Sequence, residues 1–195
     1  SRITRYRIRS MPQTQLYIRQ MTLSDVNLAM NLKDQVGWNQ TPDDIRRLIE
    51  YEPDGCFIAE VDGVPVGTVS TTSYGTKLAW IGMMLVLPEY RRRGIASQLI
   101  QKSIDYLCER GVTCVKLDAT PIGQPLYEQL GFLAEWGFQR WEREGENVPT
   151  FSLDGDLSTQ LVAMDEVAFG ADRSCWLLSV ASDCRVFTLQ STFGM

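Results

Sequence analysis

The chain of 195 residues contains no histidine. Catalytic sites that pair serine or cysteine with histidine are therefore excluded, and so are metal sites with histidine ligands. Its five cysteines lack any Cys-x-x-Cys spacing, and their odd number argues against a disulfide framework and favours a reducing compartment. We therefore expect a cytoplasmic protein without a metal site, in which carboxylates, tyrosine, cysteine, lysine or water carry any acid–base chemistry.

Long apolar stretches are also missing from the chain. No apolar run approaches the ~18 residues of a membrane-spanning helix, and the start has no signal-peptide core. A hydrophobic content of 44% and a charged content of 22% are typical of an ordinary globular domain. The net charge of −5 argues against a general binder of polyanions, so we expect neither a nucleic-acid nor a membrane partner.

Residues 85–96 hold the clearest local pattern. An apolar run ends at Pro88, and the basic turn Arg91-Arg92-Arg93-Gly94 follows. Apolar residues then recur at helical spacing as far as Cys108, and Gly111 ends the predicted helix.

This basic turn has the chemistry of an anion site. The first N–H groups of a helix lack partners within it and lie at the positive end of its dipole. Gly94 has no Cβ to hold a ligand away, and the three arginines add positive charge. The pattern predicts a seat for a phosphate or pyrophosphate, with a solvated basic loop before an ordinary helix as the alternative.

Two motifs resemble those of the GCN5-related N-acetyltransferases. The first is Arg91-x-x-Gly94-x-Ala96 after Val86-x-Pro88, and the second is Leu-Tyr-Glu-Gln-Leu-Gly-Phe over residues 126–132. The resemblance covers residues 16–141 and is strongest to a bacterial subgroup with two such domains in tandem. It implies the family's α/β (α+β) fold, with a mixed, mostly antiparallel sheet of six to seven strands, helices on both faces, and splayed central parallel strands.

The resemblance also implies that acetyl-CoA is a co-substrate. Arg91 opens the motif, and the main-chain amides expected to face the pyrophosphate are those of Arg92, Arg93, Gly94, Ile95, Ala96 and Ser97. The pantetheine arm would pair with the backbone of Met84, Leu85 and Val86. Thr120 stands where the family often carries an asparagine that contacts the pantetheine.

In the family, the tyrosine of the second motif is the usual general acid, and here it is Tyr127. Acetyl transfer needs a neutral amine, a polarised thioester carbonyl and a proton for the leaving thiolate. Backbone N–H groups near Leu85 and Val86 can polarise the carbonyl, and a phenol is a neutral proton donor at pH 7. Glu60 and Asp118 are candidate bases; a surface carboxylate is the competing interpretation for each, and a water chain is the alternative.

We therefore expect an acetyl-CoA-dependent N-acetyltransferase that acts on a primary amine, in a small molecule or a protein, by direct attack. A non-catalytic acyl-CoA-binding sensor or scaffold is the alternative, and a structural interaction module that does not bind CoA is a third interpretation.

The remaining patterns predict the flanking elements. We expect strands over 16–20, 56–61, 64–72, 77–87, 112–119 and 132–141, and helices over 24–36 and 122–130. A further helix is expected to open at Thr41-Pro42, with Ile45, Leu48 and Ile49 on its inner face. Ser24 and Thr41 are the expected caps, and Asp62-Gly63 the expected hairpin turn. The Trp38-Asn39-Gln40 loop is either a surface loop with an anchoring tryptophan or one wall of the acceptor pocket.

The expected domain organisation has three parts. Residues 1–13 form a basic arm, residues 14–143 the acetyltransferase domain, and residues 144–195 an appendage that resembles the start of a second, incomplete domain. The appendage is expected to hold a helix over 157–169, a second helix that starts at Asp172 or Ser174 and runs to Ala181, and a strand over 185–189. We expect it to pack on the first domain, with a homodimer formed through it as the alternative.

Overall fold

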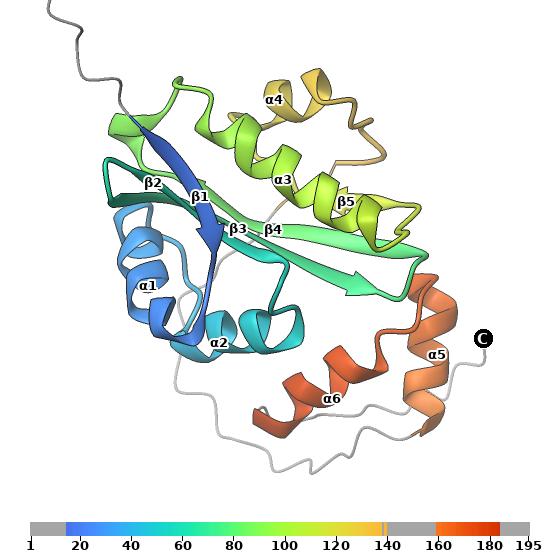
Figure 1. Ribbon diagram of the computed structural model, residues 1–195. Helices are drawn as coiled ribbons and strands as arrows, with labels where there is room; N and C mark the ends of the chain where they lie inside the picture. Colours follow the sequence, from blue (N-terminus) through green and yellow to red (C-terminus); the bar gives the residue numbers. More distant parts are fainter. Residues whose placement is uncertain (1–14, 138, 140–158, 184–195) are drawn as a thin grey trace, which may run out of the picture. The chain divides into compact units, whose positions relative to one another are not determined.

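The computed structural model describes residues 15–137, 139 and 159–183 (Figure 1). Its described strands form one sheet in the order β1-β2-β3-β4-β5. The strands are β1 (Leu16–Gln20), β2 (Cys56–Val61), β3 (Val64–Tyr74), β4 (Leu78–Val86) and β5 (Val115–Leu117). The α-helices are α1 (Val26–Gln35), α2 (Pro42–Tyr51), α3 (Ile95–Glu109), α4 (Gln124–Gln129), α5 (Thr159–Phe169) and α6 (Ser174–Asp183), and the 3-10 helices are η1 (Leu23–Asp25) and η2 (Pro88–Tyr90).

The chain divides into two compact units, which are described separately below. The first unit comprises Ser1–Thr71 and Gly82–Asp105, and the second comprises Thr72–Ile81 and Tyr106–Met195. Strands β3 and β4 and helix α3 each contribute residues to both units.

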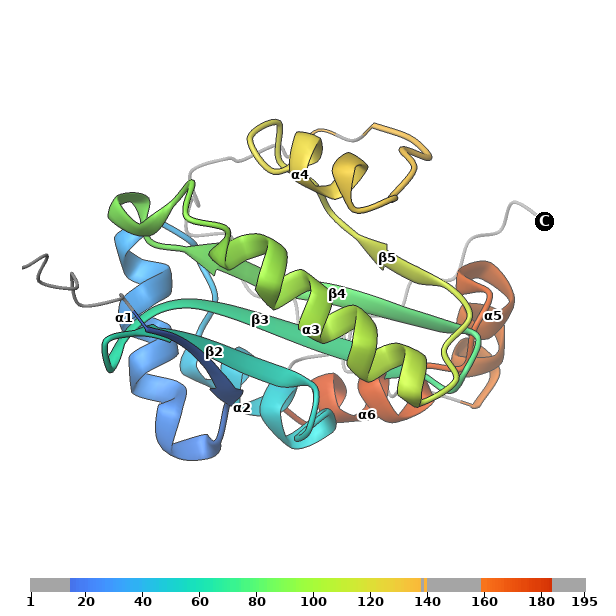
Figure 2. The same cartoon turned by 45° about the horizontal axis from the view of Figure 1, so that its top comes forward.

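In the first unit, alternation along β2 decides which helices cover which face of the sheet. Cys56 and Ile58 pack with residues of α1 and α2, whereas the aromatic ring of Phe57 lies 5.7 Å from the Lys102 ammonium of α3. Successive side chains of a strand point to opposite faces, so α1 and α2 cover one face and α3 the other. Figure 2 shows this arrangement of the helices about the strands of the first unit.

Local chemistry explains where several elements of the first unit begin and end. The Thr41 hydroxyl accepts a hydrogen bond from the Asp44 amide at 3.2 Å, and the Asp44 carboxylate accepts one from the Thr41 amide at 2.8 Å. This reciprocal cap, with Pro42 in the first helical position, starts α2 as predicted. The hairpin between β2 and β3 turns at Asp62 and Gly63, whose φ values of 52° and 79° fit the turn type expected of that dipeptide.

In the second unit, β5 runs parallel to β4, in register from Ala79↔Val115 to Ile81↔Leu117. The C-terminal helices join the β3–β4 hairpin of this unit through a small apolar cluster. Tyr74 and Leu78 pack there with Ala171 from the α5–α6 connection, and the rings of Tyr74 and Phe169 meet edge to face at 5.3 Å. Arg173 strengthens the connection, because it pairs with Asp165 at 2.6 Å and stacks over Phe169.

The structure confirms the fold class and corrects several details. The described part of the sheet has five strands rather than six or seven, because residues 132–137 form no strand. The Asp25 carboxylate accepts from the Thr22 amide at 2.8 Å, so Thr22, rather than Ser24, starts the first helical segment. The predicted arm over 1–13 and the predicted strand over 185–189 lie outside the described residues. No helix in the described ranges combines the length and apolar character needed to cross a membrane.

Candidate functional site

The basic turn between β4 and α3 has the backbone expected of an anion seat. Arg92 and Gly94 both have left-handed φ values, 63° and 78°. Such a turn points successive N–H groups toward one side, where an anion can bind. The amide of Gln98 makes the first helical bond, to the Gly94 carbonyl at 3.2 Å, so the amides before it are those that α3 itself cannot satisfy. Space is open around Gly94, where an added Cβ would meet nothing within 4 Å.

Two of the three arginines hold the turn itself together. Arg91 Nε donates to the Val86 carbonyl at 2.9 Å, and Arg93 donates to the Glu89 carbonyl at the same distance. The Arg93 guanidinium also stacks over the ring of Tyr90 at 5.0 Å. These contacts fix the path of the chain from β4 into α3 and keep positive charge next to the seat. All three arginines remain exposed.

The end of β4 approaches β3 unusually closely. A Cβ placed on Gly67 of β3 would lie 2.6 Å from the Leu85 carbonyl oxygen. Only glycine therefore allows this spacing of the two backbones. Earlier in β4, Met83 has a left-handed φ of 47°, and its carbonyl accepts a hydrogen bond from the Thr68 hydroxyl at 2.9 Å. This irregularity marks the point from which Met84, Leu85 and Val86 lead into the basic turn.

The pairing between β4 and β5 stops early. The register ends at Ile81↔Leu117, whereas β4 continues for five further residues, Gly82–Val86. Beyond Ile81, no residue of β4 has a partner in β5 in this register. A strand with unpaired backbone groups can accept an extended amide-containing ligand as an added strand.

Glu60, a candidate base, takes part in an ion-pair cluster within the first unit. Its carboxylate accepts from Arg19 Nε at 2.8 Å, and the other nitrogens of Arg19 bind Asp25 at 2.8 and 2.9 Å. The hydrogen bonds from Arg19 are the main reason that the pKa of Asp25 falls to about 2. The sequence analysis did not foresee this cluster, because Arg19, Asp25 and Glu60 lie on three separate elements.

The second unit holds the other predicted residues. Asp118 directly follows β5 and is exposed. Thr120, also exposed, organises the start of α4: its carbonyl accepts from the amides of Gly123 and Gln124, both at 2.9 Å. Its hydroxyl accepts a further, longer bond from the Gly123 amide at 3.3 Å. Thr120 is therefore a turn-forming residue in this structure.

Tyr127 of α4 is buried, with 8% of its surface exposed. Its ring contacts that of Phe132 at 6.0 Å, in an edge-to-face geometry, and packs over Gly123. Burial raises the pKa of the Tyr127 phenol above its ordinary value, so the group remains protonated near neutral pH. It is thus a neutral hydroxyl, which can act as a hydrogen-bond and proton donor.

Comparison with known proteins supports the family suggested by these features. The family model described as "Acetyltransferase (GNAT) family" matches residues 23–132, which make up more than half of the chain. The chain therefore belongs to the GNAT acetyltransferase family.

Individual proteins show how far the likeness extends. The protein named "Uncharacterized N-acetyltransferase YitH", from Bacillus subtilis (strain 168), is 27% identical over 165 residues, which cover 80% of this chain and 57% of YitH. A crystal structure from Pyrococcus horikoshii has a TM-score of 0.71 at 24% identity, covering 92% of this chain and 66% of that chain. Aminoglycoside N-acetyltransferase AAC(6')-Iy, solved in complex with CoA, has a TM-score of 0.57 at 23% identity, covering 70% of this chain and 100% of that chain. The chain thus spans less than two thirds of the length of both YitH and the Pyrococcus protein.

Proposed function

We propose that this chain is an acetyl-CoA-dependent N-acetyltransferase that transfers an acetyl group to a primary amine by direct attack. The observation that carries the proposal is the turn over residues 91–94, with two left-handed residues ahead of the 15-residue helix α3. We propose that its amides face the pyrophosphate and that the adjoining end of β4, beyond its pairing with β5, binds the amides of a pantetheine arm. Family membership and the CoA complex of AAC(6')-Iy support the choice of CoA as the ligand.

In the proposed reaction, the neutral amine attacks the thioester carbonyl carbon and the carbon–sulfur bond then breaks. Backbone N–H groups near Leu85 and Val86 stabilise the negative charge that develops on the carbonyl oxygen. We assign to Tyr127 the proton that the leaving thiolate takes up, because its buried phenol is neutral at pH 7. The proton lost by the amine passes to water or a carboxylate, so no covalent enzyme intermediate is needed.

For the proton acceptor, we propose a water chain. A proton arriving at Glu60 would weaken its ion pair with Arg19, and Asp118 lies exposed to solvent. Both carboxylates remain testable candidates, since Glu60→Gln or Asp118→Asn would lower the turnover number if either group accepted the proton.

Cofactor binding is tested by isothermal titration of acetyl-CoA into wild type, Gly94→Ala and Gly63→Ala. Both glycines have nearly the same left-handed φ, 78° and 79°, and open space around the Cβ position, so both substitutions carry the same backbone cost. Only Gly94 lies at the proposed seat. We expect Gly94→Ala to weaken binding by at least about tenfold and Gly63→Ala to leave it unchanged. Equal affinities for all three proteins would refute the cofactor assignment.

Turnover is tested by chromatographic detection of free CoA with a panel of small and peptide amines, for wild type and Tyr127→Phe. Chromatography is preferable to a thiol reagent because Cys108, Cys114 and Cys175 are exposed and would react. We expect Tyr127→Phe to lower the turnover number by about 10²–10⁴-fold without weakening acetyl-CoA binding. Tight acetyl-CoA binding with no CoA release for any amine would instead favour a non-catalytic sensor or scaffold.

A further inference from the structure

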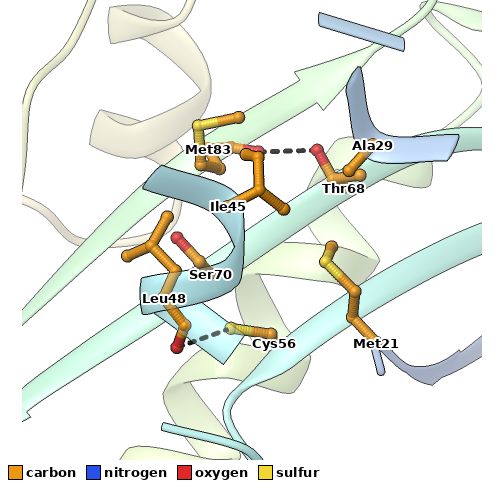
Figure 3. A pocket seen from close by; sticks show the side chains of 8 residues that line it. All are labelled: Met21, Ala29, Ile45, Leu48, Cys56, Thr68, Ser70 and Met83. Carbon is orange, nitrogen blue, oxygen red and sulfur yellow. Dashed lines mark hydrogen bonds between the residues drawn. The ribbon is translucent and has the colours of Figure 1, made fainter. Parts of the chain in front are cut away.

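A small pocket lies within the first unit, between helices α1 and α2 and strands β2–β4 (Figure 3). Its apolar walls include Met21, Ile45, Leu48 and Met83. The space inside it that a water-sized group can occupy is about 10 Å³. A cavity needs roughly 10–15 Å³ by this measure to hold one water molecule, so this pocket has room for a single group of about that size.

Three of the residues at the floor of the pocket have polar side chains. Cys56 of β2 and Ser70 of β3 are opposite each other in the sheet register, and Thr68 lies two residues before Ser70. Two of the three groups have partners: the Thr68 hydroxyl donates to the Met83 carbonyl, and the Cys56 thiol donates to the Leu48 carbonyl at 3.7 Å. The Ser70 hydroxyl, on a residue only 2% exposed, has no hydrogen-bond partner among the described residues. Figure 3 shows it directed toward Leu48 and Ile45, in the interior of the pocket.

The chemistry of the lining limits what can occupy this space. None of the residues that line the pocket is charged, so a charged group would lose its hydration without gaining a counter-ion. A purely apolar group would leave the Ser70 hydroxyl unpaired, which is unfavourable in a buried site. A small uncharged group that can form a hydrogen bond fits both constraints, and a hydroxyl fits best because it both donates and accepts.

The pocket adjoins β4, the strand that we propose binds the pantetheine arm of acetyl-CoA. Met83 lines the pocket, and Met84–Val86 follow it directly in β4. The Thr68 hydroxyl holds the Met83 carbonyl at 2.9 Å, so the pocket floor and the start of this stretch are joined by a hydrogen bond. The pocket and the stretch assigned to the pantetheine arm therefore meet at Met83.

We propose that the Ser70 pocket, defined by Met21, Ile45, Leu48, Cys56, Ser70 and Met83, selects amine acceptors with a hydroxyl on the carbon next to the amine-bearing carbon. This inference rests on the function proposed above. The substrate class is the 2-amino alcohols, and Ser70 is the specificity residue that binds their hydroxyl group.

The test compares L-serinamide with L-alaninamide, which differ only by that hydroxyl group. The specificity constant kcat/KM is measured for each amine with wild type, Ser70→Ala and Ser103→Ala. Ser103 is a matched control, because its hydroxyl is also buried but donates to the Leu99 carbonyl within α3 at 3.1 Å. Wild type and Ser103→Ala should prefer serinamide by about tenfold, which corresponds to one neutral hydrogen bond, and Ser70→Ala should lose this preference.

The results separate the pocket from the catalytic proposal. The same ratio of the two amines in wild type and Ser70→Ala would overturn the inference, since the hydroxyl would then serve at most an ordered water molecule. If no variant acetylates either amine, titration of both amines into the CoA-saturated protein decides. Binding of serinamide that is stronger than that of alaninamide only when Ser70 is present would support the pocket and reject the catalytic proposal, whereas equal or absent binding would overturn the pocket as well.

Discussion

Replacement of Gly67 by alanine tests whether the close approach of β3 to β4 shapes the proposed cofactor strand. The new Cβ would lie 2.6 Å from the Leu85 carbonyl oxygen, whereas real Cβ contacts are essentially never shorter than 3.0 Å. The methyl group would also lie 3.3 Å from Val86 and 3.4 Å from Leu99. Since the closest atom belongs to the backbone, the end of β4 must move away from β3.

The expected cost follows from two opposing effects. Overpacking of a buried site costs about 1–3 kcal/mol. Alanine also has less conformational entropy than glycine in the unfolded chain, which stabilises the folded state by about 0.4–1 kcal/mol, because the position does not need a left-handed φ. The net destabilisation is about 1–2 kcal/mol, which lowers Tm by ~2–8 °C for a chain of this size. The backbone of Leu85 is proposed to bind the pantetheine arm, so the affinity for acetyl-CoA should also fall. A loss of ~1.4 kcal/mol in binding free energy corresponds to an affinity about tenfold lower.

The assays are thermal unfolding by circular dichroism and titration with acetyl-CoA. Gly82→Ala is the matched control, since Gly82 is also a strand glycine without a left-handed φ and its Cβ would only touch the Ser70 hydroxyl at 3.4 Å. We expect the control to stay close to wild type in both measurements. A Gly67→Ala protein with the stability and affinity of wild type would refute the role given to this contact.

Two further predictions concern Asp25 and Tyr127. Arg19 lowers the pKa of Asp25 from 3.8 to about 2, so the ionised form stabilises the fold fully above pH 4, and this contribution disappears as the pH falls toward 2. Asp25→Asn should therefore lower the urea-measured free energy of unfolding by about 1–2 kcal/mol at pH 6, with the difference from wild type shrinking between pH 4 and pH 2; a constant difference would contradict this account. Gly123→Ala would place a Cβ 3.0 Å from the Tyr127 ring. We expect a several-fold lower turnover number with unchanged acetyl-CoA affinity, and an unchanged turnover number would argue against a role for the position of that ring.

Interactions between residues close together in the sequence allowed several features of the fold to be predicted. The Thr41 cap, the Asp62-Gly63 turn and the basic turn before α3 each depend on neighbouring residues, and the structure has all three as predicted. Element lengths were less predictable: β5 covers Val115–Leu117 rather than 112–119, because its end depends on pairing with β4.

The candidate site divides in the same way. The sequence by itself determined the basic turn that we propose as the anion site, since successive residues of that turn supply its amides and its charge. Only the tertiary structure decided that Glu60 binds Arg19 and that Ser70 has no partner within the described ranges, because both facts depend on which strands and helices meet. The alternation of Thr68 and Ser70 with apolar residues in a buried strand was the available signal, but a pattern along one strand does not reveal which groups the neighbouring elements will satisfy.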